Sequence, residues 1–335
     1  MNEKPIVGIL LGDAAGIGPE VIAKLLNQKK IQQYCKPVII GDAKLLEQGF
    51  EIAGERTGYT AIKDIEEVDW SKDVPVLDIG YTDLSQVVMG TVSIECGKSC
   101  LKQIETAVGL YKKGKIEGIA YGPFNKGAMK LGGNKEESEL KLYEVLFEEK
   151  GTVGEINMVD DVWTTRVTSH IPIKDVSANL TSEGIYNAIK LAYSTLKKAG
   201  KETPRLAVAA LNPHAGENGL CGREELDVIA PAVIKAKEKG MDVSGPFSAD
   251  ILFIKAFNHD FDGVVTMFHD QGQIALKLKG FERGVTIGGG LSCPTATCAH
   301  GTAFDIAGKN LANTTPTENA IKYVSIMATN NKKRG

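Results

Sequence analysis

Three of the five histidines in this sequence directly follow short β-branched runs, in segments rich in hydrogen-bonding residues. They are His170 in SHIP, His214 in NPHAGENG and His269 in HDQG. Neutral imidazole is the commonest side-chain ligand for divalent transition metals, and three protein ligands with an open position are typical of a catalytic zinc site. The pattern favours a catalytic metal centre, although each histidine alone also fits a hydrogen-bonded loop residue. Three imidazoles suit Zn²⁺ best, with Mg²⁺, Mn²⁺ and Co²⁺ as alternatives.

Two carboxylates and a lysine lie in the neighbouring motifs. Asp250 is in SADILF, and Asp270 directly follows His269. We expect both carboxylates either to fix an imidazole tautomer by hydrogen bonding or to act as further ligands. The candidates for a general base at such a centre are Asp250, Lys126 and a metal-bound water.

A glycine-rich segment, GDAAGIGPEV (12–21), follows the first apolar run of the chain. The spacing of its glycines differs from the G-x-G-x-x-G fingerprint of dinucleotide-binding Rossmann domains, so an ordinary Rossmann site is rejected. One interpretation is a strand-to-helix turn with Pro19 in the first helical turn. The other is a loop whose backbone approaches a ligand closely.

The segment AHGTAFDIAGKNLANTTPTENAI (299–321) is the most specific stretch of the chain. Its small residues allow backbone groups to surround an adenine ring. A carboxylate at Asp305 can accept hydrogen bonds from an adenosine ribose and would repel a 2′-phosphate, which favours NAD over NADP. An N-cap role for Asp305 is the alternative.

These motifs must be positioned by a repeating pattern of strands and helices. Short β-branched runs occur at 6–10, 37–41, 118–122, 162–168, 205–211 and 263–268. Amphipathic segments typical of helices occur at 19–28, 100–114, 182–200 and 225–240. The alternation predicts an α/β protein with a largely parallel sheet. Ligands of such sheets bind beyond the carboxyl ends of the strands, which is where the three histidines fall.

Composition excludes several classes of partner. The chain has 335 residues, a net charge of −3 and a pI of about 6.0, with no basic stripe. Nucleic acid and anionic membranes are therefore not expected as partners. The first apolar run is too short for a signal peptide or a membrane span, and the six cysteines form no C-x-x-C pair. We expect a cytoplasmic protein without disulfides.

The motifs together resemble the 4-hydroxythreonine-4-phosphate dehydrogenase family of vitamin B6 biosynthesis. Its relatives include 4-phospho-D-threonate and 4-phospho-D-erythronate dehydrogenases and a terephthalate dihydrodiol dehydrogenase. The segments that carry the resemblance are GDAAGIGPE, YGPFNKGAM, TSHIP, LNPHAGENG, GPFSADILF, MFHDQGQIALK and HGTAFDIAG. The last one also resembles the adenosine loop of isopropylmalate and isocitrate dehydrogenases.

The resemblance implies an isocitrate/isopropylmalate dehydrogenase-like fold, in which two α/β domains flank a cleft and the outer domain has a mostly parallel sheet. We place the outer, NAD-binding domain at 1–127 plus 277–335, and a central domain for dimerisation and metal binding at 128–276. The family further implies a homodimer with shared active sites. His170 and His214 of one subunit would then bind the metal with His269 of the other.

Further site residues come only from the resemblance. NAD is expected near His300, Gly301, Asp305 and Asn313. Lys277 matches a substrate-contacting lysine. The other residues predicted to face the substrate are Asn212, Arg283, Thr286 and Thr295.

The chain departs from the family where the substrate's anionic groups are expected. The family's GHTE motif is missing, because residues 132–145 read GGNKEESELKLYEV. Thr286 and Thr295 replace a family asparagine and a family arginine. Loss of a bidentate, charge-assisted donor is not conservative. Lys135, Lys141 and Arg283 are candidate replacements, unless the substrate lacks the phosphate.

The sequence therefore predicts an NAD- and metal-dependent dehydrogenase that oxidises a secondary alcohol of a small hydroxy acid, with decarboxylation. The closest family activity converts 4-(phosphooxy)-L-threonine to 3-amino-2-oxopropyl phosphate. Alternatives are the same chemistry on 4-phospho-D-threonate, 4-phospho-D-erythronate, an unphosphorylated acid or a dihydrodiol acid. A metal-dependent hydrolase or lyase and a non-catalytic family member also remain open.

Overall fold

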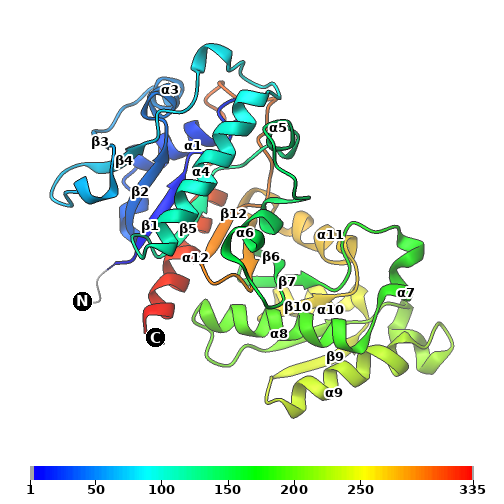
Figure 1. The fold of residues 1–335 in the computed structure, drawn as a ribbon. Helices are drawn as coiled ribbons and strands as arrows, with labels where there is room; N and C mark the ends of the chain where they lie inside the picture. The colour runs from blue at the N-terminus through cyan, green and yellow to red at the C-terminus, as the bar shows by residue number, and fades with distance from the viewer. Residues whose placement is uncertain (1–3, 334–335) are drawn as a thin grey trace. The chain divides into compact units, whose positions relative to one another are not determined.

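The computed structural model describes residues 4–333, which form two compact units (Figure 1). Unit 1 comprises Met1–Glu149 and Leu291–Gly335, and unit 2 comprises Lys150–Gly290. Both units are α/β, as the alternation of strands and helices predicts.

Unit 1 is built on a fully parallel sheet with strand order β3-β4-β2-β1-β5-β12. Its strands are β1 Ile6–Leu10, β2 Lys36–Gly41, β3 Tyr59–Ile62, β4 Val74–Asp78, β5 Gly118–Tyr121 and β12 Thr295–Cys298. The central strands are buried on both faces, so they consist of nearly continuous apolar residues.

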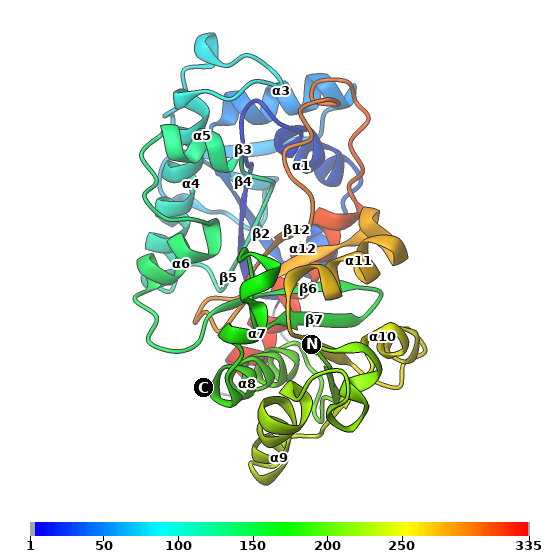
Figure 2. The same ribbon diagram turned by 90° about the vertical axis from the view of Figure 1, so that its right-hand side faces the viewer.

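Helices cover both faces of this sheet. They are α1 Gly18–Asn27, α2 Ile31–Tyr34, α3 Ala43–Ala53, α4 Ile94–Lys112, α5 Lys126–Leu131, α6 Glu139–Phe147 and α12 Thr315–Lys332. Figure 2 shows α4, α5 and α6 on one side of the strands and α1 and α12 on the other. Ser93 caps α4 by accepting a hydrogen bond from the Cys96 amide, and Asn125 caps α5 through the Ala128 amide.

Unit 2 has a mixed sheet with strand order β11-β6-β7-β10-β8-β9. Its strands are β6 Gly154–Val159, β7 Val162–Arg166, β8 Leu206–Ala209, β9 Val243–Phe247, β10 Gly263–Thr266 and β11 Val285–Gly289. Strand β6 runs antiparallel to both β7 and β11, whereas β7, β10, β8 and β9 are parallel. The carboxyl ends of β7, β10 and β8 therefore lie at one edge of the sheet.

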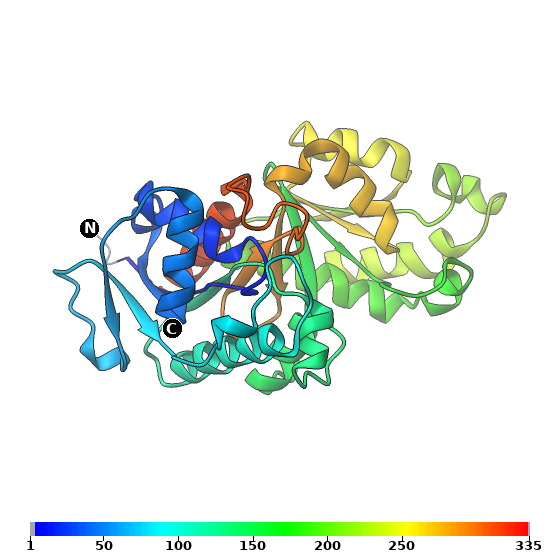
Figure 3. The ribbon, with the colours of Figure 1, turned by 90° about the horizontal axis from the view of Figure 1, so that it is seen from above.

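The helices of unit 2 are α7 Val176–Asn179, α8 Ser182–Lys198, α9 Ala230–Glu238, α10 Ala249–Phe257 and α11 His269–Gly280. Figure 3 shows α10 and α11 (yellow and gold) on one side of the strands and α8 (green) on the other. Helix α9 packs against α8 and β9. It follows a π-helical turn, η5 (Glu225–Ile229), so the single helix predicted over 225–240 is divided.

The boundaries of the units differ from the predicted 127/128 and 276/277. Residues 128–149 belong to unit 1 because α6 packs against α4. Residues 277–290 belong to unit 2 because α11 contacts β6, β7 and β10 and because β11 pairs with β6. The chain thus passes from one unit to the other after complete helices and strands. The sequence motifs do not indicate these positions.

All six predicted strands are present, as are the helices predicted at 19–28, 100–114 and 182–200, with ends shifted by up to six residues, whereas the helix predicted at 225–240 is divided. Among residues 4–333, no helix combines the length and the apolar character that crossing a bilayer requires. The six cysteines are free thiols, and all except Cys221 are buried.

Candidate active site

His170 and His269 lie side by side in unit 2. Strands β7 and β10 pair in parallel, with Thr266 opposite Arg166, so the residues that follow them leave the sheet at the same edge. The two imidazole centroids are 5.7 Å apart, with an interplanar angle of 40°. His170 has a positive φ of 48°, whereas His269 begins α11 rather than lying in the predicted loop.

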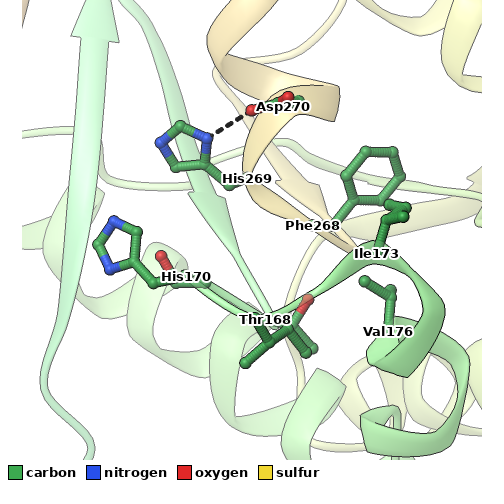
Figure 4. Close-up of a pocket in the computed structure, with 9 residues that line it drawn as sticks. Thr168, His170, Ile173, Val176, Phe268, His269 and Asp270 are labelled. Carbon is green, nitrogen blue, oxygen red and sulfur yellow. Dashed lines mark hydrogen bonds and ion pairs between the residues drawn. The ribbon is translucent and has the colours of Figure 1, made fainter.

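Asp270 fixes the orientation of the His269 ring. Its Oδ1 lies 2.7 Å from Nδ1 of His269 (Figure 4). Nε2 is therefore left for another partner, and in Figure 4 that nitrogen lies on the side of the ring away from Asp270. A carboxylate on one imidazole nitrogen is the arrangement that metal-ligating histidines use to fix their tautomer and basicity.

The geometry of this pair fits a shared cation. With metal–nitrogen distances of about 2.0–2.1 Å, two imidazoles on one tetrahedral ion have ring centroids roughly 5 Å apart. The observed separation is 5.7 Å, slightly more than this value. The donor set of two imidazole nitrogens suits zinc or another divalent transition metal.

A cavity of about 520 Å³ lies beside the two rings. It is lined by Thr168, Ser169, His170, Ile171, Ile173, Val176, Phe268, His269 and Asp270. Phe268, Ile173 and Val176 form an apolar wall, and the imidazoles and Asp270 form the polar part (Figure 4). A concave apolar space with a few converging polar groups is the usual form of a small-molecule site.

His214 follows the third strand end, after β8, and its surroundings differ. Its Nδ1 lies 3.4 Å from the Glu217 carboxylate. The charge of His214 also contributes to lowering the pKa of the Asp250 carboxyl, although the hydrogen bond from Ser248 is the main cause. Within one chain, residues 4–333 contain no group of three His, Cys, Asp or Glu side chains placed to hold a metal ion.

Asp250 is in the first turn of α10 and is exposed to solvent. The Ser248 hydroxyl donates to its Oδ1 at 2.6 Å. The Ser248 hydrogen bond lowers the pKa of Asp250, so the carboxylate is ionised at neutral pH but is a weaker base than an unperturbed aspartate.

The predicted cofactor segment forms an irregular loop in unit 1 between β12 and α12. Nδ1 of His300 lies 2.9 Å from the Gly301 carbonyl and 3.7 Å from the Cys298 sulfur. Burial alone would lower the pKa of His300, but its interactions with Cys298 and the Gly301 carbonyl raise it. Asp305 lies in a series of turns, and α12 begins only at Thr315, so Asp305 is not its N-cap.

The glycine-rich segment after β1 packs against this cofactor loop. The Ile17 amide donates to the Thr302 carbonyl at 3.2 Å, and a Cβ on Gly16 would lie 2.9 Å from that of Thr302. Asn313 accepts a hydrogen bond from the Thr315 amide at 3.0 Å, next to the start of α12. Two segments remote in sequence thus form one backbone-rich surface in unit 1.

Comparisons with known proteins identify the family. The chain matches the family described as "Pyridoxal phosphate biosynthetic protein PdxA" over residues 33–324. A relative from Rhizobium meliloti, provisionally named 4-hydroxythreonine-4-phosphate dehydrogenase 2, is 41% identical over 99% of this chain and 95% of its own. The D-threonate 4-phosphate dehydrogenase of Cupriavidus necator is 37% identical over 97% and 98%. This chain belongs to the PdxA family.

Solved structures agree with this membership. The crystal structure of a 4-hydroxythreonine-4-phosphate dehydrogenase from Burkholderia phymatum matches with a TM-score of 0.82 and 36% identity, covering 97% of this chain and 99% of that one. A β-decarboxylating dehydrogenase from Thermococcus kodakarensis shares the fold, with a TM-score of 0.51, 16% identity and coverage of 95% and 81%. The predicted fold class is confirmed. Membership makes this PdxA-family chain an oxidoreductase of the dehydrogenase type.

Two of the predicted substrate-facing residues are engaged within unit 2. The side-chain amide nitrogen of Asn212 donates to Glu224 at 2.7 Å and to Glu225 at 3.0 Å. Arg283 forms a bidentate ion pair with Asp160, at 2.9 and 3.0 Å, which together with Glu282 raises the pKa of its guanidinium. An anionic substrate would have to compete with Asp160 for Arg283.

Thr286 is part of a polar network that sequence reasoning missed. Its hydroxyl accepts a hydrogen bond from Asn157 at 2.9 Å, and Asn157 Oδ1 accepts from Arg166 at 2.9 Å. Arg166 also pairs with Glu155 and donates to Ser169 at the cavity. The available signal was the polar residues within two otherwise apolar strands, EINMV and VWTTR.

The remaining predicted substrate residues, and the candidate anion ligand Lys141, have partners of their own. Thr295 is buried in β12, and its hydroxyl donates to the Cys293 carbonyl within unit 1. Lys277, in α11, lies with its Nζ 5.8 Å from the Phe281 ring centroid. Lys141 pairs with Glu144 at 3.0 Å.

The segment that replaces the family's GHTE motif lines a second cavity, of about 450 Å³, in unit 1. Its lining residues are Lys126, Gly127, Met129, Lys130, Asn134, Lys135, Glu136, Glu137, Ser138 and Glu139. The predicted base Lys126 and the candidate anion ligand Lys135 therefore share one cavity. Three lysines there are accompanied by three glutamates, so the cavity is not simply cationic.

Proposed function

We propose that this PdxA-family chain is an NAD- and divalent-metal-dependent dehydrogenase that acts in the cytoplasm as a homodimer. It would oxidise the secondary alcohol of a small hydroxy acid and release CO₂ from the resulting β-keto acid. The observation that carries the proposal is the pair His170 and His269, 5.7 Å apart beside a cavity, with Asp270 holding one ring.

His170, His214 and His269 would hold the cation. When bound, a divalent cation lowers the pKa of the substrate hydroxyl and stabilises the negative charge left by decarboxylation. His170 and His269 lie together in one chain, whereas no third ligand accompanies them among residues 4–333. The family resemblance implies His170 and His214 of one subunit with His269 of the other, whereas His170 and His269 lie together in one chain here, so we propose that a second copy of the chain supplies His214 as the third imidazole.

His300, Gly301, Asp305 and Asn313 would hold NAD, which accepts the hydride when bound. The small residues of this loop and its packing against Gly16 leave backbone groups for a flat ring. The Asp305 side chain is solvent-accessible and can accept hydrogen bonds from a ribose. Its negative charge would oppose a 2′-phosphate.

The side chains of this chain would then manage the proton and orient the substrate. The candidate acceptors for the hydroxyl proton are Asp250, which is exposed, Lys126 and a metal-bound water. Asp270 keeps His269 in one tautomer. Lys277 would contact the anionic end of the substrate. None of these steps requires Arg283, which is paired with Asp160.

The relatives divide between two substrates, and 4-(phosphooxy)-L-threonine, converted to 3-amino-2-oxopropyl phosphate, is our first candidate. 4-Phospho-D-threonate is the second, and 4-phospho-D-erythronate follows. The altered motif at 132–145 and the engaged Arg283 favour including unphosphorylated and dihydrodiol acids.

A substrate screen tests the proposal. Purified chain is stripped of metal and assayed for NADH formation on each acid, with Zn²⁺, Mn²⁺, Co²⁺ or Mg²⁺ restored separately. We expect turnover that depends on both metal and NAD, and none from His214→Ala. Turnover without nicotinamide would indicate a hydrolase or lyase, and binding of metal and NAD without turnover would indicate a non-catalytic family member.

A further inference from the structure

The loop that carries His214 is strained. Five consecutive residues, His214–Asn218, have φ between 43° and 76°, and only one of them is glycine. A left-handed conformation is unfavourable for a non-glycine residue because its Cβ comes too close to the following carbonyl oxygen. Such a run persists only where surrounding groups hold it. We define residues 212–222 as the His214 loop.

The Glu225 carboxylate is the main group that supports the His214 loop. Glu225 is 2% exposed. Its Oε1 accepts hydrogen bonds from the amides of Leu211 and Asn212, both at 2.8 Å, and its Oε2 accepts from the Asn212 side chain at 3.0 Å. A Cβ added to Gly216 would lie 2.6 Å from Oε2, so the left-handed turn is packed directly against this oxygen.

The position of Glu225 is set by the framework of unit 2. It begins the π-helical turn Glu225–Ile229, which continues into α9 and so onto β9 and α8. Over residues 4–333 no lysine, arginine or histidine forms an ion pair with it. Burial of this carboxyl group is offset by its three N–H donors, so the donors and the carboxyl group hold one another in place.

The neighbouring Glu224 connects the His214 loop to the His170 segment. Its Oε2 accepts from the Asn212 side chain at 2.7 Å, and its Oε1 accepts from the Ser177 hydroxyl. Ser177 is in α7, directly after Val176, which lines the cavity beside His170. Asn212 thus lies between the two carboxylates, one on each side.

We propose that Glu225 is a positioning residue that holds the His214 loop in its left-handed conformation, and that Glu224 ties this loop to the segment after His170. The proposal rests on the proposed metal-binding role of His214. The imidazole of His214 is thereby presented in one place before the site is completed. The expected consequence is tighter metal binding, since partners that orient ligands typically contribute 10–100-fold to metal affinity.

The test compares Glu225→Gln with a matched control, Asp262→Asn. Asp262 accepts hydrogen bonds from the Arg205 amide and side chain and from Lys201, but it precedes β10, at the opposite end of the strands. Co²⁺ affinity of the full-length protein is measured from the visible absorption of the bound ion, and amide hydrogen exchange is measured across residues 211–223. Unfolding by urea reports the stability of both variants.

We expect Glu225→Gln to weaken Co²⁺ binding by at least about 10-fold and to speed exchange across the His214 loop. Asp262→Asn should lose stability while leaving both unchanged. Equal metal affinity and equal exchange in Glu225→Gln and the parent chain would overturn the proposal. If Glu225→Gln does not fold, Gly216→Ala probes the same contact from the loop side, with the same expected and contrary outcomes.

Hydrogen exchange also separates this proposal from the proposed function. If the parent chain binds no Co²⁺ but Glu225→Gln loosens the His214 loop, the metal-dependent function fails and the positioning role stands. If Co²⁺ binds tightly and the loop is equally protected in both proteins, the positioning role fails and the metal site stands.

Discussion

The carboxyl ends of the parallel strands carry different groups in the two units. In unit 2, strands β7 and β10 lead to the imidazoles of His170 and His269. In unit 1, β1 and β5 lead to glycine turns, where a Cβ on Gly12 would lie 2.8 Å from the Gly122 carbonyl carbon. The same strand geometry therefore presents imidazole side chains in one unit and closely packed backbone in the other. Ligand chemistry depends on the residues that come after each strand, not on the sheet.

The largest expected effect comes from removing a side chain at the strand ends of unit 2. His269→Ala removes one of the paired imidazoles, and a bound cation contributes several kcal/mol to stabilising charge in the reaction. We expect turnover to fall by about 10³-fold or more. Steady-state NADH formation measures it, and His259→Ala, in the exposed turn after α10, is the control. Unchanged turnover in His269→Ala would remove the imidazole pair from the mechanism.

Gly12→Ala tests the close packing of backbone at the strand ends of unit 1. Gly12 has φ 88°, and an added Cβ would meet backbone atoms of Gly122 and Pro123 within 3.1 Å. Strain and overpacking together should lower the free energy of unfolding by about 3 kcal/mol. Gly54→Ala, with φ 74° but open space around it, isolates the strain and should cost only about 1 kcal/mol. Equal losses in urea unfolding would show that packing at the strand ends is loose.

Asp270→Asn tests the carboxylate that orients one of the two imidazoles in unit 2. It removes the carboxylate that holds Nδ1 of His269 at 2.7 Å while leaving both imidazoles in place. Metal affinity should fall by roughly 10–100-fold. The control Asp242→Asn alters an exposed carboxylate just before β9, at the other end of the strands. Titration with Co²⁺ decides the matter, and an affinity equal to that of the control contradicts the role assigned to Asp270.

The smallest effect concerns two carboxyl groups with opposite pKa shifts. Burial raises the pKa of Asp13 in unit 1, despite hydrogen bonds from Ala15 and others that lower it. Burial also acts on Asp262 in unit 2, but there the hydrogen bonds from Arg205 and Lys201 outweigh it and lower the pKa. Ionised Asp13 therefore opposes folding above its ordinary pKa, whereas ionised Asp262 favours it.

Asp13→Asn should accordingly raise the free energy of unfolding by roughly 1 kcal/mol at pH 7. The advantage should shrink as the pH falls and vanish below the ordinary pKa of 3.8, where Asp13 is protonated in both states. Asp262→Asn should show the reverse, with its largest loss at neutral pH. Urea unfolding across this pH range measures both, and a pH-independent Asp13→Asn difference would contradict the assigned cause.

Much of the fold could be predicted because buried parallel strands are continuous apolar runs, as in IVGIL and GVVT. The strands that were missed are short, at an edge or interrupted by polar residues, as in GEINMV and VSGPF. The predicted loop position of His269 is wrong, because α11 begins at His269 itself.

The sequence alone determined which chemical groups are available. Three imidazoles after strands, a small-residue loop with Asp305, and the family itself follow from residue types and their order, because these properties are local. Tertiary structure decided which groups meet. That His170 lies beside His269, that Arg283 is paired with Asp160, and that Glu225 supports five left-handed residues depend on register and on loop conformations. Local periodicity carries no information about strand register or loop conformation, because both arise from contacts between residues far apart in the chain.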